Sequence, residues 1–287
     1  MWLTQGTLYT QVTRATKAEV EWLRSKESGL TYSNKKTLFS EGKVDIVRFY
    51  DLIDSRFPAG FTPIVAERAQ TCGVQVQLID SRVAPAKPTP TGLAGLYDYQ
   101  EEAVRVALDK TRGIIQMATG SGKTRTAVSI AEHLPTIHWL FVVHRIDLVE
   151  QAARVYEELT GKKAGRIGGG QWDVQPHFTC ASFQSLHQAA GKHTKLFPWV
   201  QGLITDECHT VASESHRRVA EALCNAYWRF GMSATPLDRT DQRSVFAVAL
   251  LGPIIFKVPA IALVNRGMLA MPRITMLEVP QEFRHVD

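Results

Sequence analysis

Two short strings of polar residues, distant along the chain, carry the side chains best suited to chemistry. The first runs from Met117 to Thr124 and reads M-A-T-G-S-G-K-T, and the second, D-E-C-H, runs from Asp206 to His209. A glycine-rich run that ends in Lys-Thr lets backbone N–H groups close around phosphates, while Lys123 adds a positive charge and Thr124 a hydroxyl for Mg²⁺. Two adjacent carboxylates can hold that metal ion and activate a water molecule, although the second string taken alone could equally be a surface turn after a strand. Together the strings predict a site for a nucleoside triphosphate and Mg²⁺.

Each string assigns roles to particular residues. Asp206 is expected to hold Mg²⁺ together with Thr124, and Glu207 to orient and deprotonate the attacking water. Cys208 is better explained as a small packing residue than as a nucleophile, because no base is evidently placed to activate it. The phosphate-binding residues are expected to be Thr119, Gly120, Ser121, Gly122, Lys123, Thr124 and Arg125.

The glycine-rich string departs from the general phosphate-loop pattern at one position. That pattern has glycine where this chain has Met117. The alternative interpretation is a strand-to-helix turn that happens to contain Lys-Thr. The string follows an apolar strand pattern and opens a helix pattern, which is the context that a phosphate site needs, and this favours the functional interpretation.

Two further polar strings flank the first two. Gln100 can read both the donor and the acceptor edge of adenine, and the aromatic ring of Tyr97 can stack on the base; alternatively, Tyr99 simply packs at a helix start. Ser233 and Thr235 follow another expected strand. They are either ordinary turn residues or hydroxyls that bond to the acidic pair and report whether the γ-phosphate is present.

The elements that must position these residues alternate from Leu96 onward. Short apolar runs separated by amphipathic helices indicate a parallel sheet covered on both faces. In such a sheet, ligands bind at the carboxyl ends of the strands, where both phosphate-site strings fall. The expected strands are 113–117, 139–143, 177–181, 203–206 and 230–233, and the expected helices are 99–110, 122–133, 146–159 and 214–224.

Residues 1–82 form a separate small α+β unit by pattern, with strands expected at 8–14, 43–50 and 74–79 and helices at 19–26 and 63–72. Three prolines then mark a semi-rigid linker at 83–95. The expected division is therefore an α+β unit at 1–82, the linker, an α/β domain at 96–262, and a segment at 263–287 that leads out of that domain.

Length and composition are those of a soluble protein with a real core. The 287 residues suggest about two domains, and 45% are hydrophobic and 21% charged. A net charge of +5 is compatible with nucleic acid but does not demand it. Four cysteines without CxxC spacing point to a reducing compartment, and the apolar stretch 247–264 is interrupted by two prolines and a lysine. We expect a cytoplasmic protein, in the host cytoplasm if its source is viral, with no membrane partner.

Six motifs, in order, resemble the first RecA-like domain of superfamily 2 helicases. The resemblance is greater to the DEAH-like DNA translocases, which include the XPB, phage UvsW-type and type I and III restriction-subunit motors, than to the RNA-directed DEAD-box group. It implies a RecA-like P-loop fold and an ATP-dependent DNA helicase or translocase that uses ATP and Mg²⁺. The motifs are Tyr99-Gln100, Ala118–Thr124, Val143-His144-Arg145 with Leu148 and Gln151, Ser182–Leu186, Asp206–His209 and Ser233–Thr235.

The resemblance also implies residue roles. Arg145, Ser182 and Gln184 correspond to motifs that contact the nucleic-acid backbone without reading sequence, although Arg145 could be a solvated helix start instead. His209 would couple the nucleotide to Ser233 and Thr235. Family members often carry Arg where this chain has Tyr97, so adenine stacking uses the tyrosine ring or is weaker.

The unit at 1–82 is similar to the small DNA-binding domain that precedes the motor in UvsW-type helicases. The similarity rests on 42–48, 57–61 and 76–82. It implies a DNA partner, which the sequence leaves open as single-stranded, duplex or branched, and RNA is not excluded.

Motors of this type cleave ATP between two RecA-like domains, and the second domain supplies arginines that stabilise the transferring phosphoryl group. Nothing after Thr235 resembles the second domain, and Asn265–Ala270 with Pro272 resembles the run that leads towards it. We therefore expect an N-terminal half that binds nucleotide, hydrolyses it slowly and does not unwind DNA alone. The alternatives are an idle ATP- or DNA-binding module and the motor part of a restriction complex. The intact Asp206-Glu207 pair favours an enzyme.

Overall fold

The computed structural model describes residues 1–34, 45–89, 92–190, 198–211, 218–219, 222–236 and 245–271. Most of the helix expected at 214–224 lies outside the described residues. The same holds for Pro272 and the rest of the expected exit segment beyond Met271, and for the start of the strand expected at 43–50.

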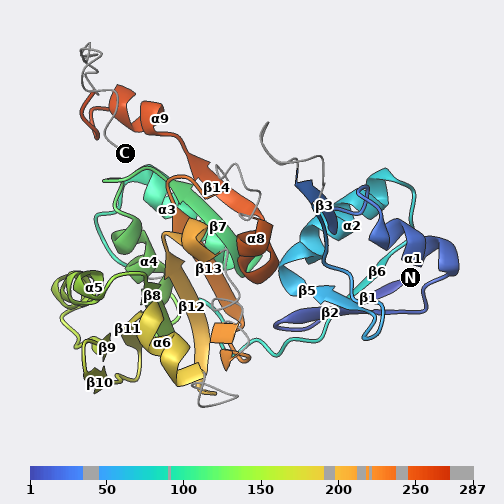
Figure 1. The fold of residues 1–287 in the computed structure, drawn as a ribbon. Coiled ribbons are helices and arrows are strands. Elements are labelled where there is room, and N and C mark those ends of the chain that lie inside the picture. The colour runs from blue at the N-terminus through green and yellow to red at the C-terminus, as the bar shows by residue number, and fades with distance from the viewer. Residues whose placement is uncertain are drawn as a thin grey trace, which may run out of the picture.

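Residues from Leu96 onward build one large sheet (Figure 1). Its strand order is β10-β9-β11-β8-β12-β13-β7-β14, and neighbouring strands pair in parallel except β9 and β10. The parallel strands bring their carboxyl ends to one edge of the sheet. The strands are β7 (Arg112–Met117), β8 (His138–Val143), β9 (Gly165–Gly168), β10 (Gln171–Asp173), β11 (Phe178–Ser182), β12 (Val200–Asp206), β13 (Trp228–Ser233) and β14 (Ile254–Val258).

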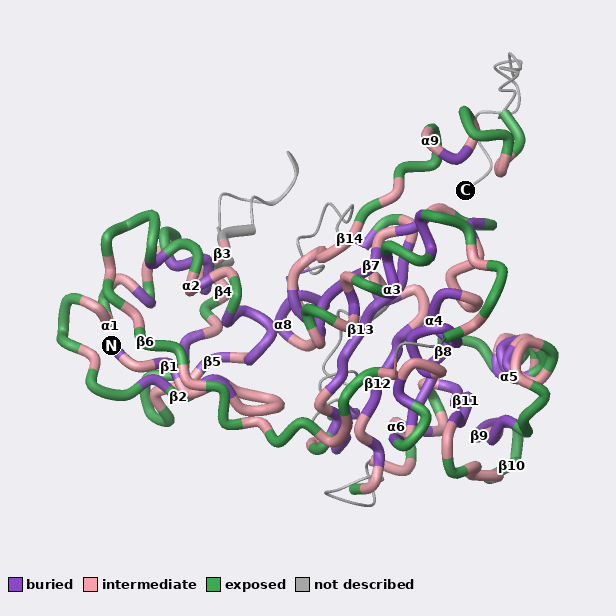
Figure 2. Tube along the Cα trace, turned by 180° about the vertical axis from the view of Figure 1, so that it is seen from behind, coloured by how far each residue is buried: buried purple, intermediate pink, exposed green. Residues whose placement is uncertain are grey.

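Helices cover both faces of this sheet, because alternate residues of each strand point to opposite sides. On β8, Trp139 and Phe141 join a core cluster with residues of α3, α4 and α5, whereas Leu140 and Val142 join a second cluster with α6. Figure 2 shows these central strands buried. The helices are α3 (Asp98–Lys110), α4 (Lys123–Glu132), α5 (Ile146–Thr160), α6 (Phe183–Ala190), α8 (Val245–Leu251) and α9 (Ala260–Asn265), with a 3-10 turn η2 (Cys208–Val211).

The expected fold class is confirmed: a mostly parallel sheet with helices on both faces follows a small α+β unit. The five expected strands of the large sheet and the helices at 99–110, 122–133 and 146–159 are present, with ends shifted by a few residues. The sequence did not predict β9, β10, β14, α6, α8 or α9. β9 and β10 have four and three residues, and α6 follows β11 without an intervening turn, so none offers a long periodic pattern.

The N-terminal unit contains a four-stranded sheet in the order β5-β2-β1-β6 and a separate β3-β4 pair. β1 pairs antiparallel with β2 and parallel with β6. The helices at 19–26 and 63–72 and the strands at 8–14 and 74–79 are found close to their expected positions, whereas β1, β3 and β5 were not expected. The elements are β1 (Trp2–Gln5), β2 (Tyr9–Thr13), α1 (Lys17–Arg24), β3 (Thr31–Asn34), β4 (Asp45–Arg48), β5 (Arg56–Pro58), η1 (Ala59–Phe61), α2 (Thr62–Thr71) and β6 (Gln77–Asp80).

The N-terminal unit packs directly against the α/β domain through α8. One hydrophobic cluster contains residues of β1, β2, α1, α2 and α8 together with Ile114 of β7. The rings of Phe49 and Phe246 meet at 5.3 Å, and the buried Arg112 guanidinium donates a hydrogen bond of 2.8 Å to the carbonyl of Thr7. The two units therefore share a core, although residues 83–89 and 92–95 between them form neither helix nor strand. Among the described residues, none of the helices has the length and apolar character needed to cross a bilayer.

Candidate nucleotide site and nucleic-acid face

The glycine-rich string forms the turn between β7 and α4. Gly120 and Gly122 have φ angles of +80° and +81°, a left-handed conformation that favours glycine. The Ser121 hydroxyl, which is buried, donates to the carbonyl of Ala118 at 2.6 Å and closes the turn. Since α4 begins at Lys123, the turn presents the first N–H groups of a helix, the usual setting for anion binding.

Residues at the start of α3 form hydrogen bonds to this turn. Gln100 is 1% exposed, and its amide nitrogen donates to the carbonyl of Ser121 at 3.0 Å, as does the Tyr99 hydroxyl at 2.9 Å. The amide oxygen of Gln100 accepts the N–H of Tyr97 at 3.1 Å. Both ends of the Gln100 amide are thus engaged within the protein in this structure. The Tyr97 ring is 55% exposed and lies parallel to the Tyr99 ring at 5.8 Å.

The structure brings the acidic pair to the glycine-rich turn. Asp206 ends β12, and the Nζ atom of Lys123 lies 3.4 Å from Oε1 of Glu207. Glu207 has a φ of +46°, a strained value for a residue with a side chain, and such strain is concentrated at functional sites. The two strings predicted from sequence therefore converge on one place.

Asp206 has the environment of a metal ligand. Its Oδ1 atom is buried and finds no hydrogen-bond partner among the described residues. Burial raises the pKa of Asp206 above its ordinary value, the neighbouring Glu207 carboxylate raises it further, and Lys123 opposes the shift. A buried carboxylate oxygen without a partner is costly unless a cation compensates its charge, so the donor set fits a divalent metal ion.

The Ser233 hydroxyl links the acidic pair to β13. His209 Nδ1 lies 3.0 Å from Ser233 Oγ and 3.2 Å from Oε2 of Glu207, and the Thr235 N–H donates to Ser233 Oγ at 3.2 Å. Thr235 thus contributes its backbone N–H to this contact. Cys208 is fully buried in the core, and burial raises the pKa of its thiol, as expected for a packing residue.

The remaining predicted phosphate-site residues lie around the turn. Thr119 is exposed and Thr124 is half-buried at the start of α4. Arg125 is turned towards the chain ahead of α3, because its guanidinium donates to the carbonyls of Ala94 and Gly95 at 3.1 and 3.2 Å. In this structure Arg125 fastens that segment to α4.

The predicted nucleic-acid residues lie on the same edge of the sheet. Ser182 at the end of β11 is in register with Val143 at the end of β8, two residues before Arg145. Arg145 is exposed beside the first turn of α5 and pairs with Asp147 at 3.0 Å. Ser182 is buried and bonds to the Ser185 hydroxyl at 2.9 Å, whereas Gln184 is exposed on the first turn of α6.

Sequence reasoning missed a glycine turn beside these residues. Gly168, Gly169 and Gly170 have φ angles of +148°, +60° and +84°. A Cβ atom on Gly168 would lie 2.3 Å from Cδ1 of Ile146 and 3.2 Å from Oγ of Ser182, so a side chain there would have to displace the isoleucine methyl group, and the positive φ also favours glycine. Three consecutive glycines were the available signal, since such a run marks a turn.

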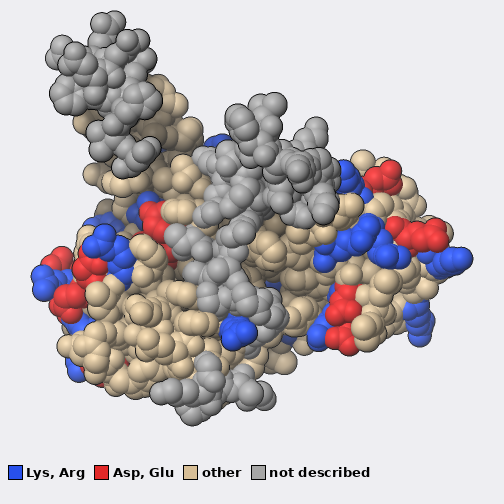
Figure 3. All heavy atoms as spheres, in the orientation of Figure 1, with Lys and Arg blue, Asp and Glu red and all other residues tan. Residues whose placement is uncertain are grey.

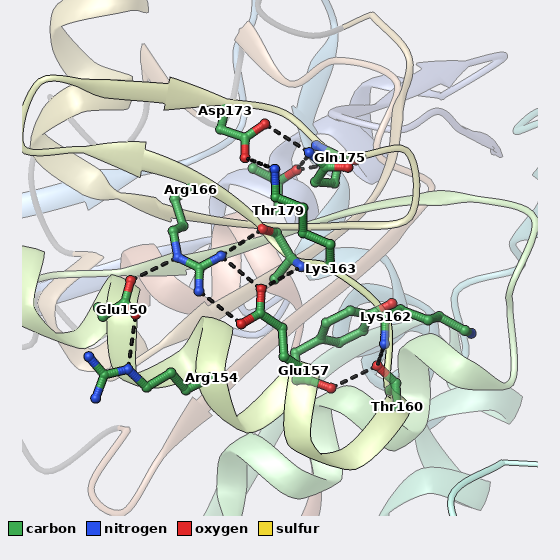
Figure 4. A network of polar contacts seen from close by, with 12 residues as sticks. Glu150, Arg154, Glu157, Thr160, Lys162, Lys163, Arg166, Asp173, Gln175 and Thr179 are labelled. Carbon is green, nitrogen blue, oxygen red and sulfur yellow. Dashed lines mark hydrogen bonds and ion pairs between the residues drawn. The ribbon is translucent and has the colours of Figure 1, made fainter.

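An ion-pair network anchors the β9–β10 hairpin that carries this turn (Figure 4). Arg166 of β9 lies between two carboxylates of α5, at 2.8 Å from Glu150 and 2.9 Å from Glu157. Lys163 and Asp173 pair at 2.9 Å. The hydrogen bonds from Arg166 lower the pKa of Glu157 and of Glu150. The network fixes the hairpin, and with it the glycine turn, against α5.

Comparison with known proteins agrees with this geometry. A family described as "Type III restriction enzyme, res subunit" matches residues 94–238, just over half of the chain. The chain is similar to the DNA 3'-5' translocase XPB2 of Sulfurisphaera tokodaii, with 35% identity over 162 residues, which is 56% of this chain and 35% of that protein. It is also similar to the putative ATP-dependent RNA helicase L396 of Acanthamoeba polyphaga mimivirus, with 29% identity over 50% of this chain and 27% of that protein. The chain thus spans about a third or less of the length of these relatives.

The fold extends the similarity to the N-terminal unit. Two solved structures of the UvsW helicase from bacteriophage T4 superpose with TM-scores of 0.71 and 0.72 at 17% identity. Each covers 90% of this chain, and the match spans 100% of one T4 chain and 57% of the other. This chain belongs to the family of the type III restriction enzyme res subunit, and its large sheet is the first RecA-like domain of a superfamily 2 helicase-type motor.

Proposed function

We propose that this chain binds ATP with Mg²⁺ at the junction of β7, β12 and β13 and is the ATP-binding half of a DNA helicase or translocase. The observation that best supports this proposal is the contact between Lys123 and Glu207. It lies beside Oδ1 of Asp206, which has no hydrogen-bond partner among the described residues. A phosphate-binding turn and an acidic pair that meet in this way can share one triphosphate.

The residues at the site fit Mg²⁺ and a triphosphate. The turn from Ala118 to Gly122 would hold the phosphates, Lys123 would neutralise their charge, and Thr124 and Asp206 would hold the metal ion. Bound Mg²⁺ would neutralise negative charge on the phosphate oxygens. Its charge would also favour the ionised form of Asp206 and so oppose the rise in pKa that burial causes.

Hydrolysis requires a group that orients a water molecule and takes its proton. Glu207 has that role in our proposal, because its carboxylate lies between Lys123 and His209. The bonds from His209 and the Thr235 N–H to Ser233 would transmit the state of the site to β13.

DNA would pass over the exposed residues at the ends of β8 and β11. Arg145 and Gln184 offer a guanidinium and an amide, groups that hold phosphates and sugars without reading sequence. The XPB2 relative is a DNA 3'-5' translocase by name, and this supports DNA as the partner. The N-terminal unit would add DNA contacts. Figure 3 shows its Lys and Arg residues mixed with Asp and Glu on the face in view, so shape would matter there more than net charge.

A second RecA-like domain would be needed for full activity. The arginines that such domains supply accelerate hydrolysis by about 10³–10⁵-fold. We therefore propose that these 287 residues bind ATP, hydrolyse it slowly and do not separate strands on their own.

The test compares ATP binding and hydrolysis in Lys123→Ala, Glu207→Gln and a control, Glu67→Gln, which neutralises an exposed carboxylate on α2. Mg·ATP binding is measured by calorimetry and hydrolysis by phosphate release, with and without single-stranded, duplex and branched DNA. We expect Lys123→Ala to lose binding, Glu207→Gln to keep binding but lose hydrolysis, and the control to match the original chain.

An idle module would give a different pattern, since Glu207→Gln would then change neither binding nor turnover. Rapid hydrolysis stimulated by DNA in the unmodified 287-residue chain would contradict the need for a second domain.

A further inference from the structure

The chain beyond the large sheet returns to the phosphate-binding turn. After α9, the N–H groups of Met268 and Leu269 both donate to the carbonyl of Leu263, at 2.9 and 3.3 Å. Leu263 is 1% exposed within the motor core, and Gly267 makes the reversal with a φ of +70°. In Figure 2, α9 is largely exposed with a short buried stretch. This segment, Ala260–Leu269, lies outside the residues that the family match covers.

Leu269 lies against the turn itself. A Cβ atom on Gly120 would stand 3.2 Å from Cδ2 of Leu269, so the leucine side chain is in contact with this glycine. Leu269 also packs on the motor core. An apolar side chain from the segment therefore borders the loop that would hold the phosphates.

Arg266 attaches the segment to α3. Its Nη1 atom lies 2.8 Å from Oδ1 and 2.7 Å from Oδ2 of Asp98, in the first turn of α3. The same turn carries Tyr99 and Gln100, which bond to the carbonyl of Ser121. The segment thus contacts the phosphate turn directly through Leu269 and indirectly through Asp98 and α3.

We propose that the segment Ala260–Leu269 forms a wall of the nucleotide site, with Arg266 as its positioning residue, so that its docking is coupled to binding of a nucleoside triphosphate. The proposal rests on the proposed function, because it needs a nucleotide at the turn. A ligand that contacts the docked segment favours docking, and by linkage the docked segment favours the ligand. Both side chains of the ion pair are about half or more exposed, so the pair is weak enough for a ligand to change its occupancy.

The first experiment measures trypsin cleavage after Arg266 in the unmodified chain, with and without Mg·ATP, by mass spectrometry. Gly267 and Arg266 form an exposed turn, and cleavage requires the side chain to leave Asp98. We expect Mg·ATP to slow this cleavage several-fold. Cleavage after Arg24, which is exposed at the end of α1, is the internal control and should not change.

The second experiment measures Mg·ATP affinity in Arg266→Ala, Arg266→Lys and Arg105→Ala. Arg105→Ala is the matched control, because Arg105 is an exposed arginine of α3 that pairs only loosely with Glu102 at 3.8 Å. We expect Arg266→Ala to bind Mg·ATP about two- to fivefold more weakly, within the range of an exposed ion pair, at unchanged melting temperature. Arg266→Lys should restore most of the affinity, and Arg105→Ala should match the original chain.

The possible outcomes distinguish a failure of this proposal from a failure of the proposed ATP-binding function. The original chain could bind Mg·ATP while the nucleotide leaves the rate of cleavage after Arg266 unchanged and Arg266→Ala binds with the original affinity. That result would refute the role of the segment as a wall and would leave the proposed nucleotide site intact. Protection without any loss of affinity in Arg266→Ala would overturn the role of Arg266. A chain that binds no Mg·ATP would overturn both proposals.

Discussion

Individual residues of the site hold positions that their types alone do not reveal. The sequence predicted that Lys123 and the Asp206-Glu207 pair lie at one site, because both strings follow apolar strands of the same parallel sheet, and the 3.4 Å contact between Lys123 and Glu207 agrees with this. The environment of Gln100 could not be predicted, since nothing in the sequence pattern shows that its amide donates to the carbonyl of Ser121. Arg125 likewise bonds to carbonyls distant in sequence. Side-chain partners of this kind depend on tertiary packing, which a linear pattern does not contain.

Gly122→Ala tests the packing of the phosphate turn. The alanine would have to adopt a left-handed backbone conformation, and its Cβ atom would lie 2.4 Å from Nε2 of Gln100. We expect a loss of more than about 1–2 kcal/mol in the free energy of unfolding, since the conformation alone costs that much, together with a clear loss of ATP affinity.

The control is Gly161→Ala, in which φ is +68° but the new atom meets nothing within 4 Å among the described residues. It should show the conformational cost alone and keep ATP affinity. Equal losses of stability in both variants, measured by urea unfolding, would show that the contact with Gln100 has no effect.

At the scale of elements, sequence predicted best where strands were apolar and long. β7, β8 and β12 are buried runs of six or seven residues, and each was expected. The β9–β10 hairpin was not expected, because its strands have only four and three residues. β9 pairs with β11 and buries Ile167, and ion pairs from Arg166 to α5 add to these contacts. Charge therefore contributes, beside strand pairing, to placing the glycine turn of this hairpin next to Ser182.

Arg166→Met should loosen this hairpin and do so in a pH-dependent way. Arg166 lowers the pKa of Glu157 and Glu150 in the folded protein, so their contribution to stability is present above the ordinary carboxyl pKa of 4.5 and is lost as the pH falls below it. We expect a melting temperature about 2–6 °C lower at pH 7, and a difference that shrinks below pH 4.5.

Arg154→Met is the matched control, because Arg154 is 68% exposed and pairs only with Glu150 among the acidic residues described. It should change the melting temperature by less than Arg166→Met. DNA affinity should fall in Arg166→Met while ATP affinity stays the same. A difference in melting temperature that persists unchanged at pH 3.5 would contradict the role of the carboxylates.

For the whole molecule, the sequence predicted two units but not how they meet. Composition separated residues 1–82 from the α/β part through the proline-rich stretch. The shared cluster with α8 could not be foreseen, since η1 and α8 are short and distant in the chain. Gly60 lies at the contact: a Cβ atom there would stand 2.0 Å from the carbonyl oxygen of Val248.

Gly60→Val should therefore separate the two units or displace them. Overpacking of this kind costs about 1–3 kcal/mol. We expect calorimetric unfolding to split into two transitions and proteolysis in 83–95 to accelerate. Gly73→Ala is the control, because that site, on the same unit, is open among the described residues. A single transition at the original temperature in Gly60→Val would show that the units do not depend on this contact.

We propose that Lys123 and Asp206 act on one magnesium-bound triphosphate. A double-mutant cycle on Mg·ATP affinity, with Lys123→Met, Asp206→Asn and the double variant, tests it most directly. We expect strong coupling, with the double variant binding about as weakly as the weaker single variant. If the loss of Mg·ATP affinity in the double variant equals the product of the losses in the two single variants, the two residues act independently, which would contradict a shared ligand.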